Sequence, residues 1–111
     1  MDCLFCTFVS GQIPVDFVYA TDTVVAFRDI SPQAPTHILI VPKSHFPNAA
    51  DLAMNAPSVA AELLTVAGDL AESEALTGYR LVFNTGESAG QSVFHAHLHL
   101  LGGREFAWPP G

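Results

Sequence analysis

One short segment of the chain places residues capable of chemistry at a fixed spacing. His95, His97 and His99 occupy every second position of the sequence HAHLHLL, and they are three of the five histidines in the chain. Side chains of an extended strand alternate between two faces, so the three imidazoles are predicted to share one face, with next-but-one neighbours roughly 7 Å apart. The apolar residues between them are then expected to point into a core.

The histidine stripe by itself leaves three interpretations open. His-x-His on a strand is a common zinc ligand pair, and a neutral imidazole is also a good nucleophile or acid–base group near pH 7. A purely structural role would require hydrogen-bond partners for three packed imidazoles.

The loop before the stripe favours phosphorus chemistry. Gly90, Gln91 and Ser92 lead directly into it. Glycine lets backbone amides approach a ligand closely, and successive amides in such a turn form an anion-binding nest, to which Ser92 adds a hydroxyl. A phosphate bound there would face the histidines, so the local pattern predicts phosphorus transfer through a histidine.

A second pattern is the Cys-x-x-Cys pair formed by Cys3 and Cys6. One pair is no disulfide framework, and a thioredoxin-like redox motif would follow a strand, whereas no strand is expected ahead of this pair. Metal binding is therefore favoured, but two thiolates supply only half of a tetrahedral zinc site. Two more ligands must come from elsewhere in the chain.

Composition and charge narrow the class of protein. The chain has 111 residues, 50% of them hydrophobic, which suits a single domain over residues 1–111. Its net charge of −7, with four Lys or Arg residues, argues against nucleic-acid binding, which requires clustered cations. No apolar run approaches the ~20 residues of a membrane span, and no signal peptide is recognisable. We expect a cytoplasmic protein that binds neither nucleic acid nor membrane.

The elements that must position these residues are predicted from the same sequence. Helices are expected over 3–10 and from Pro57 to about Ala75, with a further helical turn at 51–54. Strands are predicted at 17–21, 23–28, 36–42, 79–84 and 93–102. Because short turns rather than repeated crossover helices join the strands, we predict an α+β fold: an antiparallel five-stranded sheet with one long and one short helix.

Several segments together resemble a known family. HAHLHLL resembles the His-φ-His-φ-His-φ-φ signature of the histidine triad superfamily, where φ is an apolar residue. Three longer segments resemble the histidine-triad nucleotide-binding branch of this superfamily: NTGESAGQSVFHAHLHLLGG, WPPG and RDISPQAPTHILIVPKSH. The resemblance covers nearly the whole chain. It implies the histidine-triad fold and purine nucleoside phosphoramidase or nucleotidyl hydrolase activity.

The resemblance also implies roles for individual residues. His97 matches the histidine that attacks the α-phosphorus and forms a nucleotidyl-histidine intermediate, which water then hydrolyses. His99 is expected to contact the phosphate, Ser92 to lie near the scissile bond, and His37 to support proton handling or to serve a structural role. The implied nucleotide-binding residues are Phe27, Asp29, Ile30, Asn84, Gly90, Gln91, Ser92, His97 and His99.

Three of the nucleotide-binding positions have more specific assignments. Asp29 matches a carboxylate that accepts hydrogen bonds from the ribose hydroxyls, although an aspartate there also fits a turn cap. Phe27 and Ile30 match the apolar walls of a base pocket, and Phe27 alternatively belongs to the core.

The resemblance implies a metal site and a partner as well. Cys3, Cys6, His45 and His95 are the implied ligands of one structural Zn²⁺ per chain, which would tie the N-terminal helix to the strand bearing the nucleophile. A homodimer is implied, in which the tail around Trp108 borders the partner's site, with a purine nucleotide such as AMP or a nucleoside phosphoramidate as ligand. Two other functions compete: a nucleotide-binding regulatory module with incidental turnover, and a metallohydrolase with a catalytic zinc on the three histidines.

Overall fold

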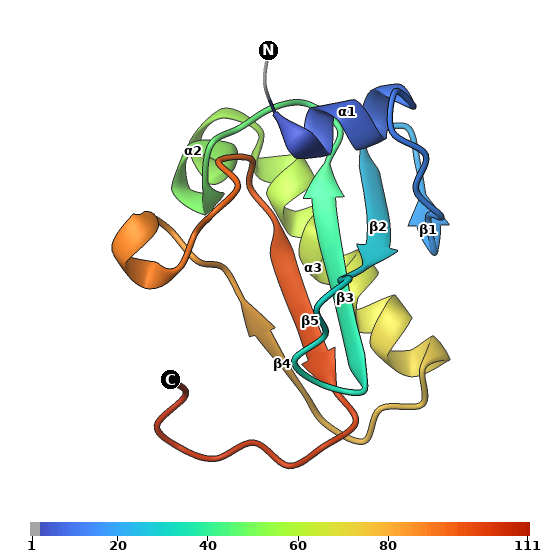
Figure 1. Ribbon diagram of the computed structural model, residues 1–111, viewed down its shortest axis with the longest axis vertical. Helices are drawn as coiled ribbons and strands as arrows, with labels where there is room; N and C mark the ends of the chain where they lie inside the picture. The colour runs from blue at the N-terminus through green and yellow to red at the C-terminus, as the bar shows by residue number, and fades with distance from the viewer. Residues whose placement is uncertain (1–2) are drawn as a thin grey trace.

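The computed structural model describes residues 3–111, and its elements follow the predicted order. The helices are α1 (Leu4–Ser10), α2 (Ala49–Asn55) and α3 (Pro57–Ser73), with a 3₁₀ turn η1 at Glu87–Ala89. The strands are β1 (Tyr19–Ala20), β2 (Val24–Arg28), β3 (Thr36–Pro42), β4 (Tyr79–Val82) and β5 (Leu98–Gly102). The α+β prediction is confirmed, and the single helical turn expected at 51–54 is a second short helix, α2 (Figure 1). Within residues 3–111, no helix has the length and apolar character needed to cross a membrane.

All five strands form one antiparallel sheet in the order β1-β2-β3-β5-β4. β3 is central and is buried along its whole length because both of its faces are covered. Ile38 and Ile40 pack in the cluster beneath α3, whereas Leu39 and Val41 pack on the other face with Phe5 of α1. The sheet therefore separates two apolar layers, with α3 over one face and α1 over the other.

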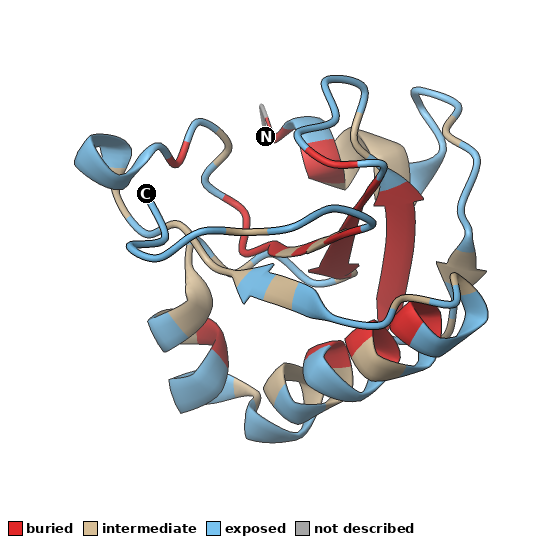
Figure 2. Ribbon diagram, turned by 90° about the horizontal axis from the view of Figure 1, so that it is seen from below, coloured by how far each residue is buried: buried red, intermediate tan, exposed pale blue. Residues whose placement is uncertain are grey.

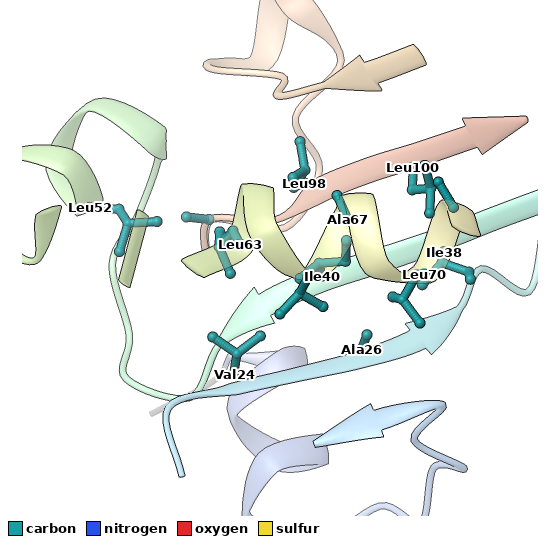
Figure 3. Packing of buried hydrophobic residues seen from close by; sticks show 13 residues of the cluster. Val24, Ala26, Ile38, Ile40, Leu52, Leu63, Ala67, Leu70, Leu98 and Leu100 are labelled. Atoms are coloured by element: carbon teal, nitrogen blue, oxygen red, sulfur yellow. The ribbon is translucent and has the colours of Figure 1, made fainter. Parts of the chain in front are cut away.

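The main core lies between the sheet and α3. The apolar residues of α3 are spaced so that they lie along one side of the helix, where they pack against the side chains of the strands (Figure 3). They are Leu63, Val66, Ala67 and Leu70. Figure 2 shows the buried residues of α3 turned toward the sheet and its exposed residues turned toward solvent. Pro57 begins this helix, as predicted, because the first turn needs no N–H from that residue.

The strand predicted over 93–102 is shorter than expected, because β5 begins only at Leu98. Beyond the partner of Leu98, β3 reaches Pro42, which has no N–H to donate to a neighbouring strand. The N–H of Ala96 donates instead to the carbonyl oxygen of Phe46, 2.6 Å away. The first two histidines of the stripe therefore precede the strand and are held by the loop that follows β3.

Candidate active site

The histidine segment still alternates between the two faces of the fold. The residues between the histidines lie in the core beneath α3, as predicted: Ala96, Leu98 and Leu100. On the opposite side, Phe5 of α1 packs against the rings of both His95 and His97. The rings of His97 and His99 are also in contact, with centroids 4.9 Å apart.

His97 is 8% exposed and is oriented by its own segment. Its Nδ1–H donates to the carbonyl oxygen of His95, 2.7 Å away. A neutral imidazole carries one hydrogen, so Nε2 of His97 keeps a free lone pair. Phe5 packs edge-on against the ring, with centroids 5.0 Å apart and planes at 87°. The result is a restrained imidazole whose second nitrogen is available as a nucleophile.

A chain of hydrogen bonds determines which nitrogen of His99 carries the hydrogen. The backbone N–H of Gln33 donates to Nδ1 of His37, 3.0 Å away. The hydrogen of His37 is then on Nε2, which donates to Nδ1 of His99 at 2.9 Å. His99 therefore carries its hydrogen on Nε2, and this atom is buried without a hydrogen-bond partner among residues 3–111.

Burial keeps both of these rings neutral. It lowers the pKa of His37, although the charge of Asp29, whose Oδ2 lies 3.5 Å from Nε2 of His37, acts in the opposite direction. Burial, together with the neighbouring His97 and His37, lowers the pKa of His99 to about 4. At neutral pH His99 is thus an uncharged donor. A buried donor that lacks a protein partner is suited to bind a ligand oxygen.

His97 and His99 border a cavity of about 320 Å³, a size typical of small-molecule sites. The cavity lies among α1, the end of β2 and the loop between β4 and β5. Eight of the predicted site residues line it: Phe27, Asp29, Ile30, Asn84, Gly90, Ser92, His97 and His99. His37 contacts the cavity only through His99, and Gln91 does not line it.

Gln91 and Gly90 shape the loop between β4 and β5. The side chain of Gln91 is buried, and its oxygen accepts the N–H of Gly86 at 2.8 Å. Its Nε2 donates to the carbonyl oxygens of Pro47 and Val93, at 2.7 and 3.1 Å. These bonds make Gln91 a support of the loop rather than a cavity residue. Gly90 has a φ of +90°, a left-handed conformation that favours glycine, so its role is also conformational.

Asp29 has both of the features considered from the sequence. Its Oδ1 accepts the backbone N–H of Ser31 at 2.8 Å and so caps the turn after β2. The same carboxylate lines the cavity, where its remaining lone pairs are available to a ligand. Ile30 lies at the rim and is 98% exposed, so an apolar ligand group placed against it would remove that surface from water.

The contribution of α1 to this cavity was not predicted from the sequence. Leu4, Phe5 and Phe8 line it. Both phenylalanines make edge-to-face contacts with Phe27, at centroid distances of 5.4 and 5.3 Å. The Cys-x-x-Cys pattern predicts only that this helix carries two thiols. The missed signal is the run LFCTF, whose aromatic residues need an apolar surface that the metal site does not provide. Val15, Leu39 and Val93 line the cavity as well, and Arg28 at the end of β2 borders it.

The four predicted metal ligands converge beside α1. The donor atoms of Cys3, Cys6, His45 and His95 all lie within 4.8 Å of one another. Sulfur–nitrogen separations are 3.3, 3.5 and 3.6 Å, and the two Nδ1 atoms are 3.2 Å apart. A tetrahedral zinc with Zn–S of ~2.3 Å and Zn–N of ~2.0 Å requires sulfur–nitrogen edges of about 3.5 Å and a nitrogen–nitrogen edge of about 3.3 Å. These four separations match the edges that a tetrahedral zinc site requires.

The surroundings of these donors also suit a cation. Nε2–H of His95 donates to the carbonyl oxygen of Pro42 at 2.8 Å, which leaves Nδ1 as the free ligand atom. Burial lowers the pKa of His95, which favours the neutral ring that a metal needs. Burial, followed by the hydrogen bond and charge of Cys3, raises the pKa of Cys6 to about 11. Two thiolates at this position would therefore require a neutralising cation.

The antiparallel sheet and the histidine-lined cavity define a histidine-triad protein, and comparison with known proteins agrees. A family model described as the HIT domain matches residues 10–106. The purine nucleoside phosphoramidase of Escherichia coli K12 is 47% identical over 105 residues, covering 93% of this chain and 88% of that protein. An uncharacterised HIT-like protein of Synechococcus elongatus is 46% identical over 111 residues, covering 99% of this chain and 97% of that protein. The crystal structure of a HIT family hydrolase from Legionella pneumophila has a TM-score of 0.94 and 49% identity, covering 99% of this chain and 100% of that one. The chain belongs to the HIT family.

Proposed function

We propose that this chain is a nucleotide-binding hydrolase that cleaves purine nucleoside 5′-phosphoramidates through a nucleotidyl-histidine on His97. The hydrogen bond from Nδ1 of His97 to the carbonyl oxygen of His95 carries this proposal, because it leaves Nε2 as a nucleophile in a ring that lines the cavity. The name of the E. coli relative and the hydrolase name of the L. pneumophila structure support the same reaction class.

In the first step the lone pair on Nε2 of His97 attacks the α-phosphorus. The phosphorus–nitrogen bond of the substrate breaks, and the leaving nitrogen takes the electron pair and a proton, supplied from solvent through the hydroxyl of Ser92. Water then attacks the phosphorus and loses a proton to solvent, while the bond to His97 breaks and its electron pair returns to Nε2. The products are a nucleoside monophosphate and an amine.

Neutral donors hold the phosphate in this proposal. Nε2–H of His99, which has no partner among residues 3–111, donates to a phosphoryl oxygen as negative charge develops. Among residues 3–111, Arg28 is the only Lys or Arg residue that borders the cavity, and its guanidinium is paired with Glu74 at 2.9 Å. Asp29 accepts from the ribose hydroxyls, and Phe27 and Ile30 contact the base.

Mass spectrometry of the protein incubated with adenosine and guanosine phosphoramidates tests the covalent step. We expect a mass increase of one nucleotidyl group in the wild type and none in His97→Ala. Binding without an adduct or turnover would favour the regulatory module instead. The panel also reports which purine base is preferred.

We also propose that Cys3, Cys6, His45 and His95 hold one structural zinc ion. The ion would neutralise the two thiolates and tie α1 to the segment that carries His97. The metallohydrolase alternative needs all three histidines of the stripe on one ion. Among residues 3–111, however, the potential ligand groups place His95 with the cysteines and His99 with Asp29 and His37. Removal of the metal with a chelator distinguishes the structural zinc from a catalytic one. Loss of a structural zinc should lower the stability of the protein, whereas loss of a catalytic zinc should abolish the chemical step.

We propose in addition that the protein forms a homodimer. β4 is an edge strand, and its Tyr79 and Leu81 are exposed. The tail is anchored as far as Ala107, whose carbonyl oxygen accepts from Arg80 at 3.0 Å, but Trp108 beyond it is 83% exposed. A partner that pairs with β4 and covers Trp108 would bury this apolar surface. Sedimentation of the protein as a monomer at micromolar concentration would refute the dimer.

A further inference from the structure

Phe5 stands between the two clusters of side chains that the proposed function uses. Its ring centroid lies 5.9 Å from that of His95, in the cysteine–histidine cluster, and 5.0 Å from that of His97, at the cavity. Both contacts are edge-to-face, with planes at 73° and 87°. Phe5 is itself buried, so a shift of one ring requires the others to move or opens a void.

The helix that carries Phe5 serves both clusters at once. Cys3 is the N-cap of α1, and its sulfur accepts the backbone N–H of Cys6 at 3.3 Å, so the Cys3 thiol fixes where the helix begins. The same seven-residue helix contributes Leu4, Phe5 and Phe8 to the wall of the cavity. A helix this short has little stability of its own and depends on its contacts for its position. Whatever holds the thiols therefore also holds one wall of the cavity.

We propose that metal binding at the cysteine–histidine cluster and nucleotide binding at the cavity are thermodynamically coupled, and that Phe5 is the positioning residue that couples them. This inference rests on the proposed zinc and nucleotide sites. It adds that each site changes the affinity of the other through α1, although no side chain of the metal cluster lines the cavity.

The sign of the coupling follows from the shared helix. Zinc restrains α1 by its two thiolates, and a nucleotide restrains the same helix by covering Leu4, Phe5 and Phe8. Whichever ligand binds first orders the helix for the second, so the coupling is positive. It must also be reciprocal: the factor by which AMP tightens zinc equals the factor by which zinc tightens AMP.

The test is zinc affinity, measured by competition with a chromophoric chelator in the absence and presence of saturating AMP. A parallel titration of AMP, zinc and chelator without protein corrects for direct binding of zinc by the nucleotide. We expect AMP to tighten zinc about fivefold or more in the wild type, the lower end of typical allosteric couplings. AMP titrated into zinc-loaded and zinc-free protein should give the same factor. This pair of measurements on the wild type tests the coupling without any variant.

Two matched variants locate the coupling. Phe5→Leu keeps an apolar side chain but removes the ring that contacts both histidines, so AMP should then change zinc affinity by less than about twofold. Val9→Ala is the control: Val9 lies on the same helix and packs against the same apolar layer of the sheet, but it does not line the cavity. It should keep the coupling of the wild type.

The outcomes are distinguishable. Zinc and AMP that both bind, but with affinities independent of each other, would overturn the coupling and leave the proposed function intact. Equal loss in both variants would overturn the role of Phe5. Failure of the protein to bind zinc, or to bind AMP, would refute the corresponding part of the proposed function and the coupling with it.

Discussion

Replacing Asp29 with asparagine separates the two tasks that the structure gives to this carboxylate. One oxygen, Oδ1, accepts the N–H of Ser31 at 2.8 Å, and an asparagine side chain retains this acceptor. The second oxygen is replaced by an NH₂ group, which cannot accept a hydrogen bond from a ribose hydroxyl. Asp29→Asn should therefore leave the turn intact and remove only the contact to the sugar.

The expected magnitude follows from the chemistry of that contact. A hydrogen bond to a charged group contributes about 2 kcal/mol, because a charged acceptor is stronger than a neutral one. At about 1.4 kcal/mol for each factor of ten, the affinity for AMP should fall about thirtyfold. Asp29→Ala should lose the same contact and the turn as well, so it should additionally lower the free energy of unfolding by about 1 kcal/mol.

Isothermal titration calorimetry with two ligands checks this prediction. AMP should bind about thirtyfold more weakly to Asp29→Asn than to the wild type, whereas 2′,3′-dideoxy-AMP should bind equally to both. An equal loss for the two ligands would mean that the carboxylate acts only through the loop. Urea denaturation of the two variants measures the stability difference independently.

Four further perturbations test other parts of the proposed site. His97→Ala should keep AMP binding but lose turnover by orders of magnitude in a single-turnover assay; a rate within about tenfold of the wild type would exclude the covalent step. Cys6→Ser should lower zinc below one equivalent by elemental analysis and reduce the melting temperature, with unchanged metal content as the contrary result. Burial lowers the pKa of His99 to about 4, whereas a histidine in the unfolded chain has a pKa of about 6.5. Below pH 6.5 the unfolded state therefore binds more protons than the folded state. The free energy of unfolding should fall by up to about 3 kcal/mol as the pH is lowered from 6.5 to 4. His99→Gln should flatten this slope in urea titrations, and an identical slope would disprove the assignment. Truncation after Glu105 should change selectivity among phosphoramidates while the dimer and the chemistry of His97 persist; unchanged selectivity would remove the proposed role of Trp108.

Local patterns in the sequence were sufficient for the elements and for which face each residue occupies. β3 was predicted at its observed bounds, 36–42, because seven residues that favour strands end at a proline. Alternation of histidine and apolar residues correctly predicted that Ala96 and Leu98 enter the core. Such signals are local: they depend on the two-residue period of an extended chain and on the turn chemistry at its ends.

The limits of these predictions lie where distant segments meet. The predicted start of β5 was wrong because the strand's first residue depends on Pro42 in the neighbouring strand. The sequence of residues 93–102 contains no information about which residue lies beside them. The resemblance supplied the candidate residues of the cavity, but it did not show that Gln91 supports the loop from behind. The aromatic face of α1 has no partner in its own segment, so its place at the cavity was missed.

The sequence by itself determined the supply of reactive groups, their spacing and the alternation that turns three histidines away from the core. Only the tertiary structure decided what each histidine does. The register of the sheet brings Nε2 of His37 to within 2.9 Å of Nδ1 of His99, although the two residues are 62 positions apart in the sequence. Because Nδ1 of His99 accepts this hydrogen bond, its own hydrogen is on Nε2, the atom without a partner among residues 3–111. The packing of α1 brings two cysteines to His95 and Phe5 to His97. Tautomer, burial and convergence of ligands are properties of three-dimensional neighbours, and the order of residues along the chain does not contain them directly.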